Sequence, residues 1–271
     1  MVEITGEQRT DFTDKVVLIA GASQGIGAGT AQAFAAAGAR VVLGARNQER
    51  VEGVAAAIRD RGGQAVAVRA DVADEELSRR LVDTALETYG RLYAAFNNAT
   101  DGPMPAPLAE IATDEFDLGI SVNIRGTYLG MKYQVPAMLQ NDGGAIVNMA
   151  SGAGFTGHNG LAAYVAGKAG IIGLTKAAAL DYADQGIRIN VLAPGTILTE
   201  HLAAAGDRAQ ELAAQATPMR RIGRVEEVAD AVMWLCSDRS SFITGVTLPI
   251  DGGQSAGSKN DKMYRPGQPM E

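Results

Sequence analysis

Short runs of apolar and β-branched residues alternate with Ala-rich helical patterns along most of the chain. The apolar runs carry hydrophobic residues at nearly every position, as strands buried on both faces do. Seven strands are predicted: VVLIA (16–20), RVVLGA (40–45), QAVAVRA (64–70), LYAAFNNA (92–99), AIVNMA (145–150), IRINVLA (187–193) and VTLPI (246–250). Helices are predicted between them: over about 25–37, over the segment with Val51, Val54, Ala55 and Ile58 on one face, from Asp74 to Gly90, and over about 114–139, 160–183 and 225–237.

Strand–helix alternation of this kind builds a parallel sheet with helices on both faces. We therefore predict one α/β domain over residues 1–271, a doubly wound sheet of about seven strands with its core at about 14–254. Two segments lack the pattern: 100–113 carries three prolines, and 196–219 is polar and Ala-rich without a strand. Both are predicted to be loops or lids at a sheet edge, the second covering substrate. Residues 255–271 are a predicted tail, whose polar part from 258 is an arm or disordered.

The composition fits a globular domain with a substantial core, since 46% of residues are hydrophobic and 20% are charged. A net charge of −7 argues against a nucleic-acid surface. No apolar run is long enough for a membrane span, and the N-terminus lacks a secretory signal, so we expect a cytoplasmic protein. The single cysteine, Cys236, lies in the apolar run VMWLC and is predicted to be a core residue. No His, Cys and Asp cluster has metal-ligand spacing, so no catalytic metal is expected.

A glycine cluster, AGASQGIG (20–27), follows the first predicted strand and opens the first predicted helix. A structural turn would also use glycines here. The strand-to-helix context favours a Rossmann-type site, in which backbone N–H groups and the helix dipole hold a pyrophosphate. Gly21 is predicted to make the tight turn, Gly25 to admit the phosphates and Gly27 to let the helix pack on the sheet.

Tyr164 and Lys168 lie four residues apart in AYVAGK (163–168), so a helix places them on one face. The pair is either a packing tyrosine with a snorkelling lysine or an acid tuned for proton transfer. A free phenol has a pKa of about 10, and a nearby ammonium lowers it towards neutrality. Ser151 ends the strand before this helix, so both hydroxyls can reach one carbonyl oxygen.

Taken in order, several motifs resemble those of the short-chain dehydrogenases/reductases, over about residues 14–254. They are AGASQGIG (20–27), ADV (70–72), NNA (97–99), Asn123, Ser151, Tyr164 with Lys168, ProGly (194–195) and AspGlyGly (251–253). The resemblance implies an NAD(P)-dependent oxidoreductase acting on a ketone or the matching secondary alcohol.

The resemblance also implies a role for each catalytic residue. Tyr164 is the general acid in reduction and the general base in oxidation, and Ser151 hydrogen-bonds the substrate oxygen. Lys168 tunes Tyr164 and binds the ribose hydroxyls, while Asn123 holds a water that links Lys168 to solvent. The family commonly forms tetramers through the helices that carry Asn123 and Tyr164, so we expect a homotetramer or a homodimer.

A larger set of residues is expected to contact the dinucleotide, with Asp71 and Val72 flanking the adenine. The set is Gly21, Ser23, Gln24, Gly25, Ile26, Gly27, Arg46, Asp71, Val72, Asn98, Ala99, Tyr164, Lys168, Pro194, Gly195, Ile197 and Thr199. Two positions depart from the family. Ala20 stands where a threonine usually ties the glycine loop to the fourth strand, and Thr100 replaces a glycine, adding bulk near the nicotinamide ribose.

Charge at the end of the second strand indicates the cofactor. A carboxylate there binds the adenosine ribose and repels a 2′-phosphate, whereas an arginine binds that phosphate. Ala45 stands at the acid's position and Arg46 follows it, so NADP(H) is predicted over NAD(H), although Arg46 can also be a solvated charge. The alternatives are an NAD-dependent alcohol, diol or steroid dehydrogenase and, more remotely, a dinucleotide-sensing protein without catalysis.

Substrate contacts are expected in the segments that vary most among such folds. Candidates are Met104, Gly152, Phe155, His158, Leu198 and His201. His158 can instead cap the next helix, His201 can sit on the lid, and the apolar residues can be ordinary core. The identity of the substrate does not follow from the sequence.

Overall fold

The computed structural model describes residues 11–141 and 143–257. The N-terminal segment and the predicted tail from 258 lie outside the described residues. Within the described part, no helix has the length and apolar character needed to cross a membrane.

Seven parallel strands form the central sheet, in the order β3-β2-β1-β4-β5-β6-β9. They are β1 (Val16–Ala20), β2 (Arg40–Ala45), β3 (Gln64–Arg69), β4 (Ala94–Asn97), β5 (Gly144–Met149), β6 (Ile187–Pro194) and β9 (Thr247–Ile250). The predicted fold class is confirmed, because the strand order reverses between β1 and β4 as a doubly wound sheet requires. β4 is shorter than the predicted 92–99, since the chain leaves the sheet at Asn98.

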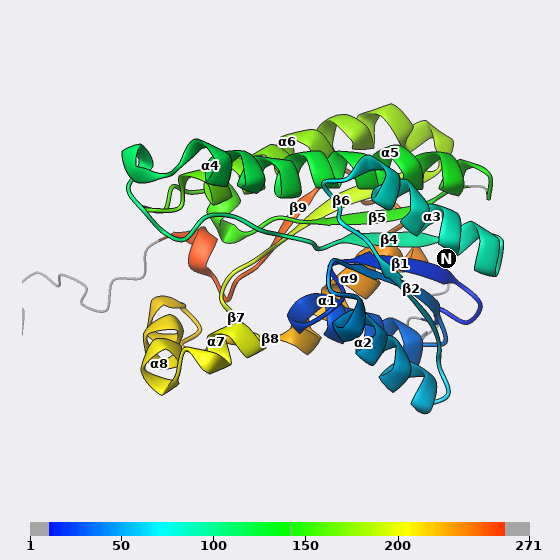
Figure 1. Ribbon diagram of the computed structural model, residues 1–271, viewed down its shortest axis with the longest axis horizontal. Coiled ribbons are helices and arrows are strands. Elements are labelled where there is room, and N and C mark those ends of the chain that lie inside the picture. The colour runs from blue at the N-terminus through cyan, green and yellow to red at the C-terminus, as the bar shows by residue number, and fades with distance from the viewer. Residues whose placement is uncertain (1–10, 142, 258–271) are drawn as a thin grey trace, which may run out of the picture.

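Helices cover both faces of this sheet (Figure 1). One face carries α1 (Gly25–Ala36), α2 (Gln48–Asp60) and α9 (Val225–Cys236). The other carries α3 (Glu75–Tyr89), α4 (Thr113–Ile120), α5 (Gly126–Leu139) and α6 (Ala162–Tyr182). Each crossover between parallel strands therefore returns over one face or the other, and every strand of the centre is buried on both sides.

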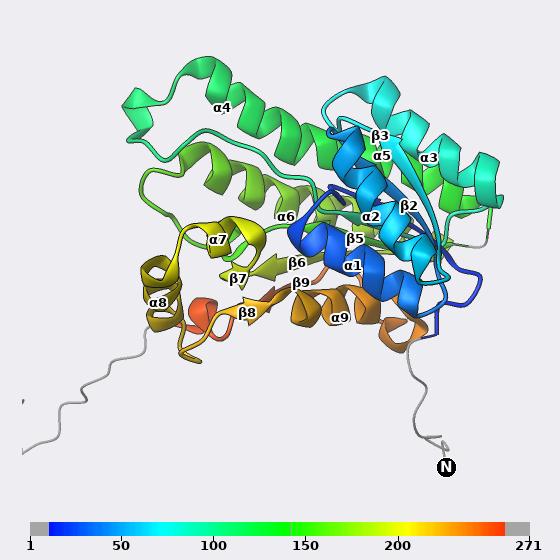
Figure 2. The ribbon, with the colours of Figure 1, turned by 60° about the horizontal axis from the view of Figure 1, so that its bottom comes forward.

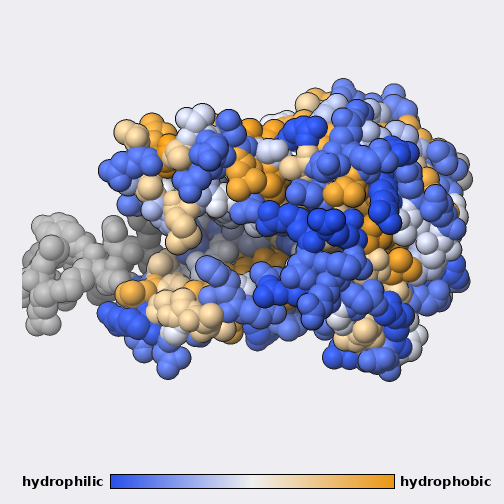
Figure 3. All heavy atoms as spheres, viewed as in Figure 1, coloured by the Kyte–Doolittle hydropathy of each residue, from blue (hydrophilic) through white to orange (hydrophobic). Residues whose placement is uncertain are grey.

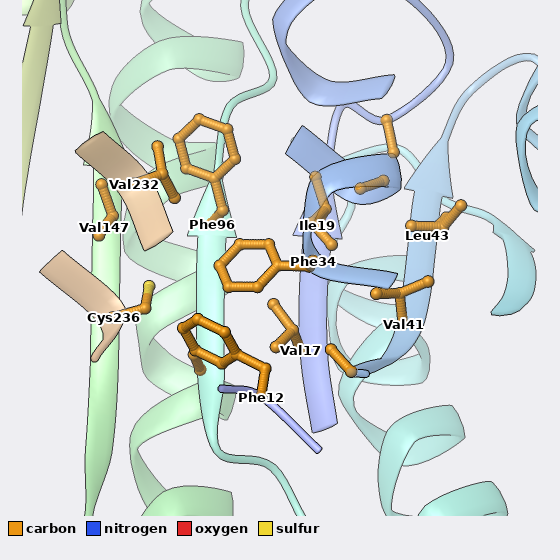
Figure 4. Packing of buried hydrophobic residues seen from close by; sticks show 14 of the residues in the cluster. Phe12, Val17, Ile19, Phe34, Val41, Leu43, Phe96, Val147, Val232 and Cys236 are labelled. Atoms are coloured by element: carbon orange, nitrogen blue, oxygen red, sulfur yellow. The ribbon is translucent and has the colours of Figure 1, made fainter. Parts of the chain in front are cut away.

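The core consists of two main layers, one on each face of the sheet. Val17 and Ile19 of β1 pack towards α1 and α9, whereas Leu18 packs towards α3 and α5. Phe12 and Phe34 meet edge to face in the first layer, with their ring centroids 4.8 Å apart (Figure 4). The core thus begins before the predicted residue 14, because a lone phenylalanine ahead of a strand has no periodicity that announces it.

The segment predicted as a helix over 114–139 is helical throughout, but it is not one regular α-helix. It is divided into α4 and α5 by a π turn, Ser121–Arg125, which contains Asn123. Side chains bond to backbone carbonyls at this point: Asn123 Nδ2 donates to Gly119 O at 2.8 Å, and Thr127 Oγ1 donates to Asn123 O at 2.7 Å. Such turns are frequent at functional sites, where they re-aim a side chain.

Residues 196–219, predicted to contain no strand, begin with the short strand β7 (Ile197–Leu198). β7 pairs in parallel with β8 (Gly223–Arg224), and a two-residue strand is too short to leave a sequence signal. The helices α7 (Glu200–Ala204) and α8 (Asp207–Ala216) follow it. Figure 2 shows them standing apart from the sheet, beyond the end of β6.

Candidate functional site

A cleft of about 400 Å³ lies at the carboxyl edge of the sheet, where the strand order reverses between β1 and β4. Figure 3 shows a recess in the surface between the helices above the sheet and those below it. Most residues predicted to contact a dinucleotide line this cleft: Gly21, Ser23, Gln24, Gly25, Ile26, Arg46, Asp71, Val72, Asn98, Ala99 and Thr199. Dinucleotides bind at this switch point in open α/β sheets.

The glycine loop has the geometry of a phosphate cradle. Gly21 has φ +82°, and a Cβ there would lie 2.7 Å from Ala99 N. A Cβ on Gly27 would collide with the Gly21 carbonyl, so only glycine allows this turn to pack against α1. α1 starts at Gly25 without a side-chain cap on Gln24, which leaves its first N–H groups for an anion. These residues fit the pyrophosphate of a dinucleotide.

Ala20 lacks the hydroxyl that was expected to connect the glycine loop to the fourth strand, and Asn98 makes this connection instead. Asn98 Nδ2 donates to Gly21 O at 2.9 Å, and Asn98 N donates to Ala20 O at 3.0 Å. The amide after β4 therefore joins the glycine loop to β4 in place of a threonine hydroxyl. Asn98 both lines the cleft and fixes the loop that forms its floor.

Three of the four predicted catalytic side chains come together between β5 and α6. Ser151 follows β5, and its Oγ accepts from Ala153 N at 3.2 Å. The Ser151 hydroxyl lies close enough to Tyr164 to lower the pKa of its phenol, and Lys168 lies one helical turn beyond Tyr164 on α6. Lys168 Nζ donates to Met149 O at 3.1 Å and sits 5.4 Å from the centroid of the Tyr164 ring.

Burial dominates the ionisation of these groups. Desolvation raises the pKa of the Tyr164 phenol, and the hydrogen bond from Ser151 acts in the opposite direction. Desolvation also lowers the pKa of Lys168, which is 1% exposed, to about 7. Lys168 is not among the groups that shift the pKa of Tyr164 here, so the expectation that it brings this pKa down stays a prediction.

Asn123 is fully buried and its side chain is engaged on the loop after β4. Its Nδ2 donates to Asp101 O at 2.7 Å, and its Oδ1 accepts from Thr100 Oγ1 at 2.9 Å. Thr100, expected to crowd the ribose, thus also directs its hydroxyl to Asn123. A Cβ on Gly167 would lie 2.9 Å from Asn123 Cβ, so the π turn abuts α6 beside Lys168. The water predicted on Asn123 stays a prediction.

Two arginines stand at the β2 side of the cleft. Arg46 follows β2, and its Nη2 is 2.7 Å from Asp101 Oδ2. Arg50 Nη1 donates to Gln24 Oε1 at 2.8 Å. With Ala45 at the strand end, this part of the cleft carries the donor chemistry that suits a phosphate ester.

Only one of the predicted substrate residues lines the cleft. His201 lines it, while Met104 (82% exposed), Phe155 and Leu198 present apolar surface to solvent. The His158 ring nitrogen is 3.3 Å from Thr156 Oγ1, and Gly152 adjoins Ser151.

The residues that line the cleft differ in part from the residues predicted to contact the cofactor. Six predicted cofactor residues do not line the cleft: Gly27, Tyr164, Lys168, Pro194, Gly195 and Ile197. Gly195 packs instead against Asp251, where a Cβ would lie 2.8 Å from Asp251 Cβ. Seven lining residues were not predicted as contacts: Ala45, Asn47, Arg50, Ala70, Thr100, Val122 and Glu200. Adjacency to Arg46 and Thr199 was the only sequence signal for Asn47 and Glu200.

The described residues do not favour metal-ion or thiol chemistry. They contain no group of three or more His, Cys, Asp or Glu side chains placed to hold a metal ion. Burial raises the pKa of the Cys236 thiol to about 12, so this side chain is a core residue with no accessible thiolate.

Comparisons with known proteins agree with this geometry. A family model described as enoyl-(acyl carrier protein) reductase matches residues 21–255. The chain is 42% identical to the A-factor type gamma-butyrolactone 1'-reductase (1S-forming) of Streptomyces virginiae, covering 89% of this chain and 96% of that protein. It is also 42% identical to the cyclohexanol dehydrogenase of an Acinetobacter strain (SE19), covering 90% and 96% respectively.

Solved structures match over nearly the whole fold. The crystal structure of levodione reductase superposes with a TM-score of 0.87 at 36% identity, covering 91% of this chain and 100% of that one. The structure of NAD+-bound xylitol dehydrogenase gives a TM-score of 0.84 at 34% identity, covering 89% and 99% respectively. These proteins are named as oxidoreductases of hydroxyl and carbonyl groups.

Proposed function

Because this chain belongs to the short-chain dehydrogenase/reductase family and is an oxidoreductase of CH–OH and C=O groups, we propose that it is an NADPH-dependent reductase of cyclic ketones. The same site would oxidise the matching secondary alcohols. One observation carries the proposal: Ser151, Tyr164 and Lys168 meet between β5 and α6, beside a cleft whose glycine loop suits a dinucleotide.

The chain's own residues would manage the proton. When bound, NADPH supplies the hydride that the carbonyl carbon receives. Tyr164 then gives its phenol proton to the substrate oxygen, and Ser151 donates a hydrogen bond to the same oxygen. Donors fixed in advance stabilise the charge that develops on that oxygen in the transition state. The proximity of the Ser151 hydroxyl to the Tyr164 phenol supports this arrangement.

Lys168 would serve both the cofactor and the phenol. Its ammonium carries three N–H groups, and the Met149 carbonyl accepts one of them. The others would bind the ribose hydroxyls of the nicotinamide half. Once held there in its charged form, Lys168 would favour the phenolate of Tyr164 and offset the effect of burial.

The cofactor preference rests on charge at the β2 end. Ala45 offers no carboxylate to the ribose, and Arg46 and Arg50 both line the cleft. A 2′-phosphate would gain charge-assisted hydrogen bonds there. The second candidate, an NAD-dependent dehydrogenase of the same kind, is favoured by one contact, since the Arg46 guanidinium is already paired with Asp101.

The proposed substrate class rests on the relatives' names and on three exposed apolar side chains. Cyclohexanol, the substrate in one relative's name, is a cyclic secondary alcohol. Met104, Phe155 and Leu198 expose apolar side chains from the loop after β4, the turn after Ser151 and β7. We infer that a compact apolar ring packs among them, with residues 196–219 acting as the lid.

Initial rates with a panel of cyclic ketones test this function directly. With cyclohexanone and its alkyl derivatives, we expect kcat/KM to be about 10- to 100-fold higher with NADPH than with NADH, the worth of one or two charged hydrogen bonds. Equal or faster rates with NADH would overturn the cofactor preference. Absence of turnover with every ketone and every matching alcohol would overturn the function.

A homotetramer also stays a proposal. Leu118, Tyr128 and Leu139 are exposed on α4 and α5, and Leu180 is 82% exposed on α6. Apolar side chains on these helices suit burial against further copies of the chain. Light scattering should report four chains of 28.1 kDa, whereas a monomer mass would reject the proposal. The single-domain organisation and the cytoplasmic location remain predictions from the sequence.

A further inference from the structure

An ion pair crosses the cofactor cleft. Arg46 directly follows β2, Asp101 lies four residues beyond β4, and β1 lies between these two strands. The 2.7 Å contact between Arg46 Nη2 and Asp101 Oδ2 therefore passes over the carboxyl end of β1, where the glycine loop turns. Any dinucleotide bound at this edge meets the pair.

The Asp101 side chain is held in place more firmly than the Arg46 side chain. Asp101 is anchored through its backbone, because its carbonyl accepts from buried Asn123 Nδ2 at 2.7 Å. Its Oδ1 also accepts from Gly102 N at 2.9 Å, and neighbouring Thr100 donates to Asn123 Oδ1 at 2.9 Å. The Asp101 side chain is 26% exposed, against 58% for Arg46. The guanidinium is therefore the movable partner and the carboxylate the fixed one.

Building on the proposed use of NADP(H), we propose that Asp101 is a cofactor-specificity residue whose carboxylate competes with the 2′-phosphate for Arg46. NAD(H) has only a hydroxyl at that position, so the pair can persist beside it. Asp101 therefore reduces the advantage that Arg46 gives to NADP(H). Arg50 does not face this competition, because it is held by the neutral side chain of Gln24.

The variant Asp101→Asn isolates the charge. Asparagine keeps an oxygen for the Gly102 N–H and leaves the backbone carbonyl to Asn123. A partly exposed ion pair is weak, so the expected tightening of NADP+ binding is about two- to five-fold in the dissociation constant. The dissociation constant for NAD+ should not change. Isothermal titration measures both on the folded, full-length protein without any need for turnover.

Two further variants make the test specific. In an Arg46→Gln background, Asp101→Asn should no longer affect NADP+ binding, because the contested guanidinium is gone. Glu110→Gln removes one negative charge from the same connection between β4 and α4, on an exposed residue, and should leave both dissociation constants unchanged.

The opposing outcomes are equally definite. Unchanged or weaker NADP+ binding by Asp101→Asn would overturn the proposal, as would equal tightening of both nucleotides or tightening that persists without Arg46. A wild-type preference for NAD+ would contradict the proposed cofactor only. It leaves this test intact, because each nucleotide is compared with itself across the variants.

Discussion

Replacing Tyr164 with phenylalanine is expected to lower kcat for ketone reduction by about 10²–10⁴-fold, the usual worth of a positioned general acid. The change removes one oxygen atom and leaves the ring that packs in the site. Because the glycine loop and Arg46 are untouched, the dissociation constant for NADP+ should change little. Single-turnover oxidation of NADPH, measured beside a binding titration, separates these two effects.

Tyr182→Phe is the matched control for this variant. Tyr182 ends the same helix, and its partly buried ring packs against the layer beside β6. Loss of that hydroxyl should leave kcat unchanged. Retained turnover by Tyr164→Phe would reject the proton-transfer role, and an equal loss in both variants would show that the helix tolerates no such change.

Replacing Lys168 with methionine is expected to remove activity while stabilising the fold. A donor lost from the reacting site typically costs about 10²–10³-fold in kcat. Lowering the pKa of a lysine from 10.5 to about 7 corresponds to roughly 5 kcal/mol of destabilisation at low pH. The Met149 carbonyl loses its donor in the variant, at a cost of about 1–3 kcal/mol, so a net gain of about 2–4 kcal/mol is expected.

The pH dependence of this gain identifies its cause. Between pH 7 and 10.5 the unfolded chain binds the lysine proton more fully than the folded protein does, so raising the pH stabilises the wild type. The penalty is complete below pH 7 and disappears towards pH 10.5. Thermal unfolding should therefore show the largest advantage of Lys168→Met at or below neutral pH, shrinking steadily in alkaline buffers.

Lys176→Met, on the exposed side of the same helix, serves as the control. It removes an ammonium that water already solvates, so neither kcat nor the melting temperature should move appreciably. A Lys168→Met protein that melts lower than the wild type at neutral pH would contradict the conclusion that burying the Lys168 ammonium destabilises the fold. Full activity in that variant would contradict its place in the site.

The apolar runs predicted the sheet well because strands buried on both faces leave a direct imprint on sequence. Helical spacing likewise predicted that Tyr164 and Lys168 share a face. Their ionisation did not follow from spacing, since it depends on burial against β5, a tertiary property. Likewise the π turn at Ser121–Arg125 was missed, because its residues keep the apolar pattern of a regular helix.

Contacts between residues far apart in the chain also could not be predicted from the sequence. Arg46 and Asp101 lie far apart in the chain and meet only because β1 separates β2 from β4 in the sheet. The amide of Asn98 replaces the tie expected from a threonine at position 20, an exchange between two neighbouring strands. The sequence motifs predicted which residues lie at the site, but only the strand order of the sheet determines which of them are in contact.

The most direct measurement is a crystal structure of the protein with NADP+ and a cyclic ketone. We expect Tyr164 Oη and Ser151 Oγ both to lie about 2.5–3.0 Å from the ketone oxygen, as hydroxyl hydrogen bonds require. We also expect Lys168 Nζ to lie within hydrogen-bond distance of the nicotinamide ribose. A complex in which the phenol faces away from that oxygen, with no serine converging on it, would contradict the account.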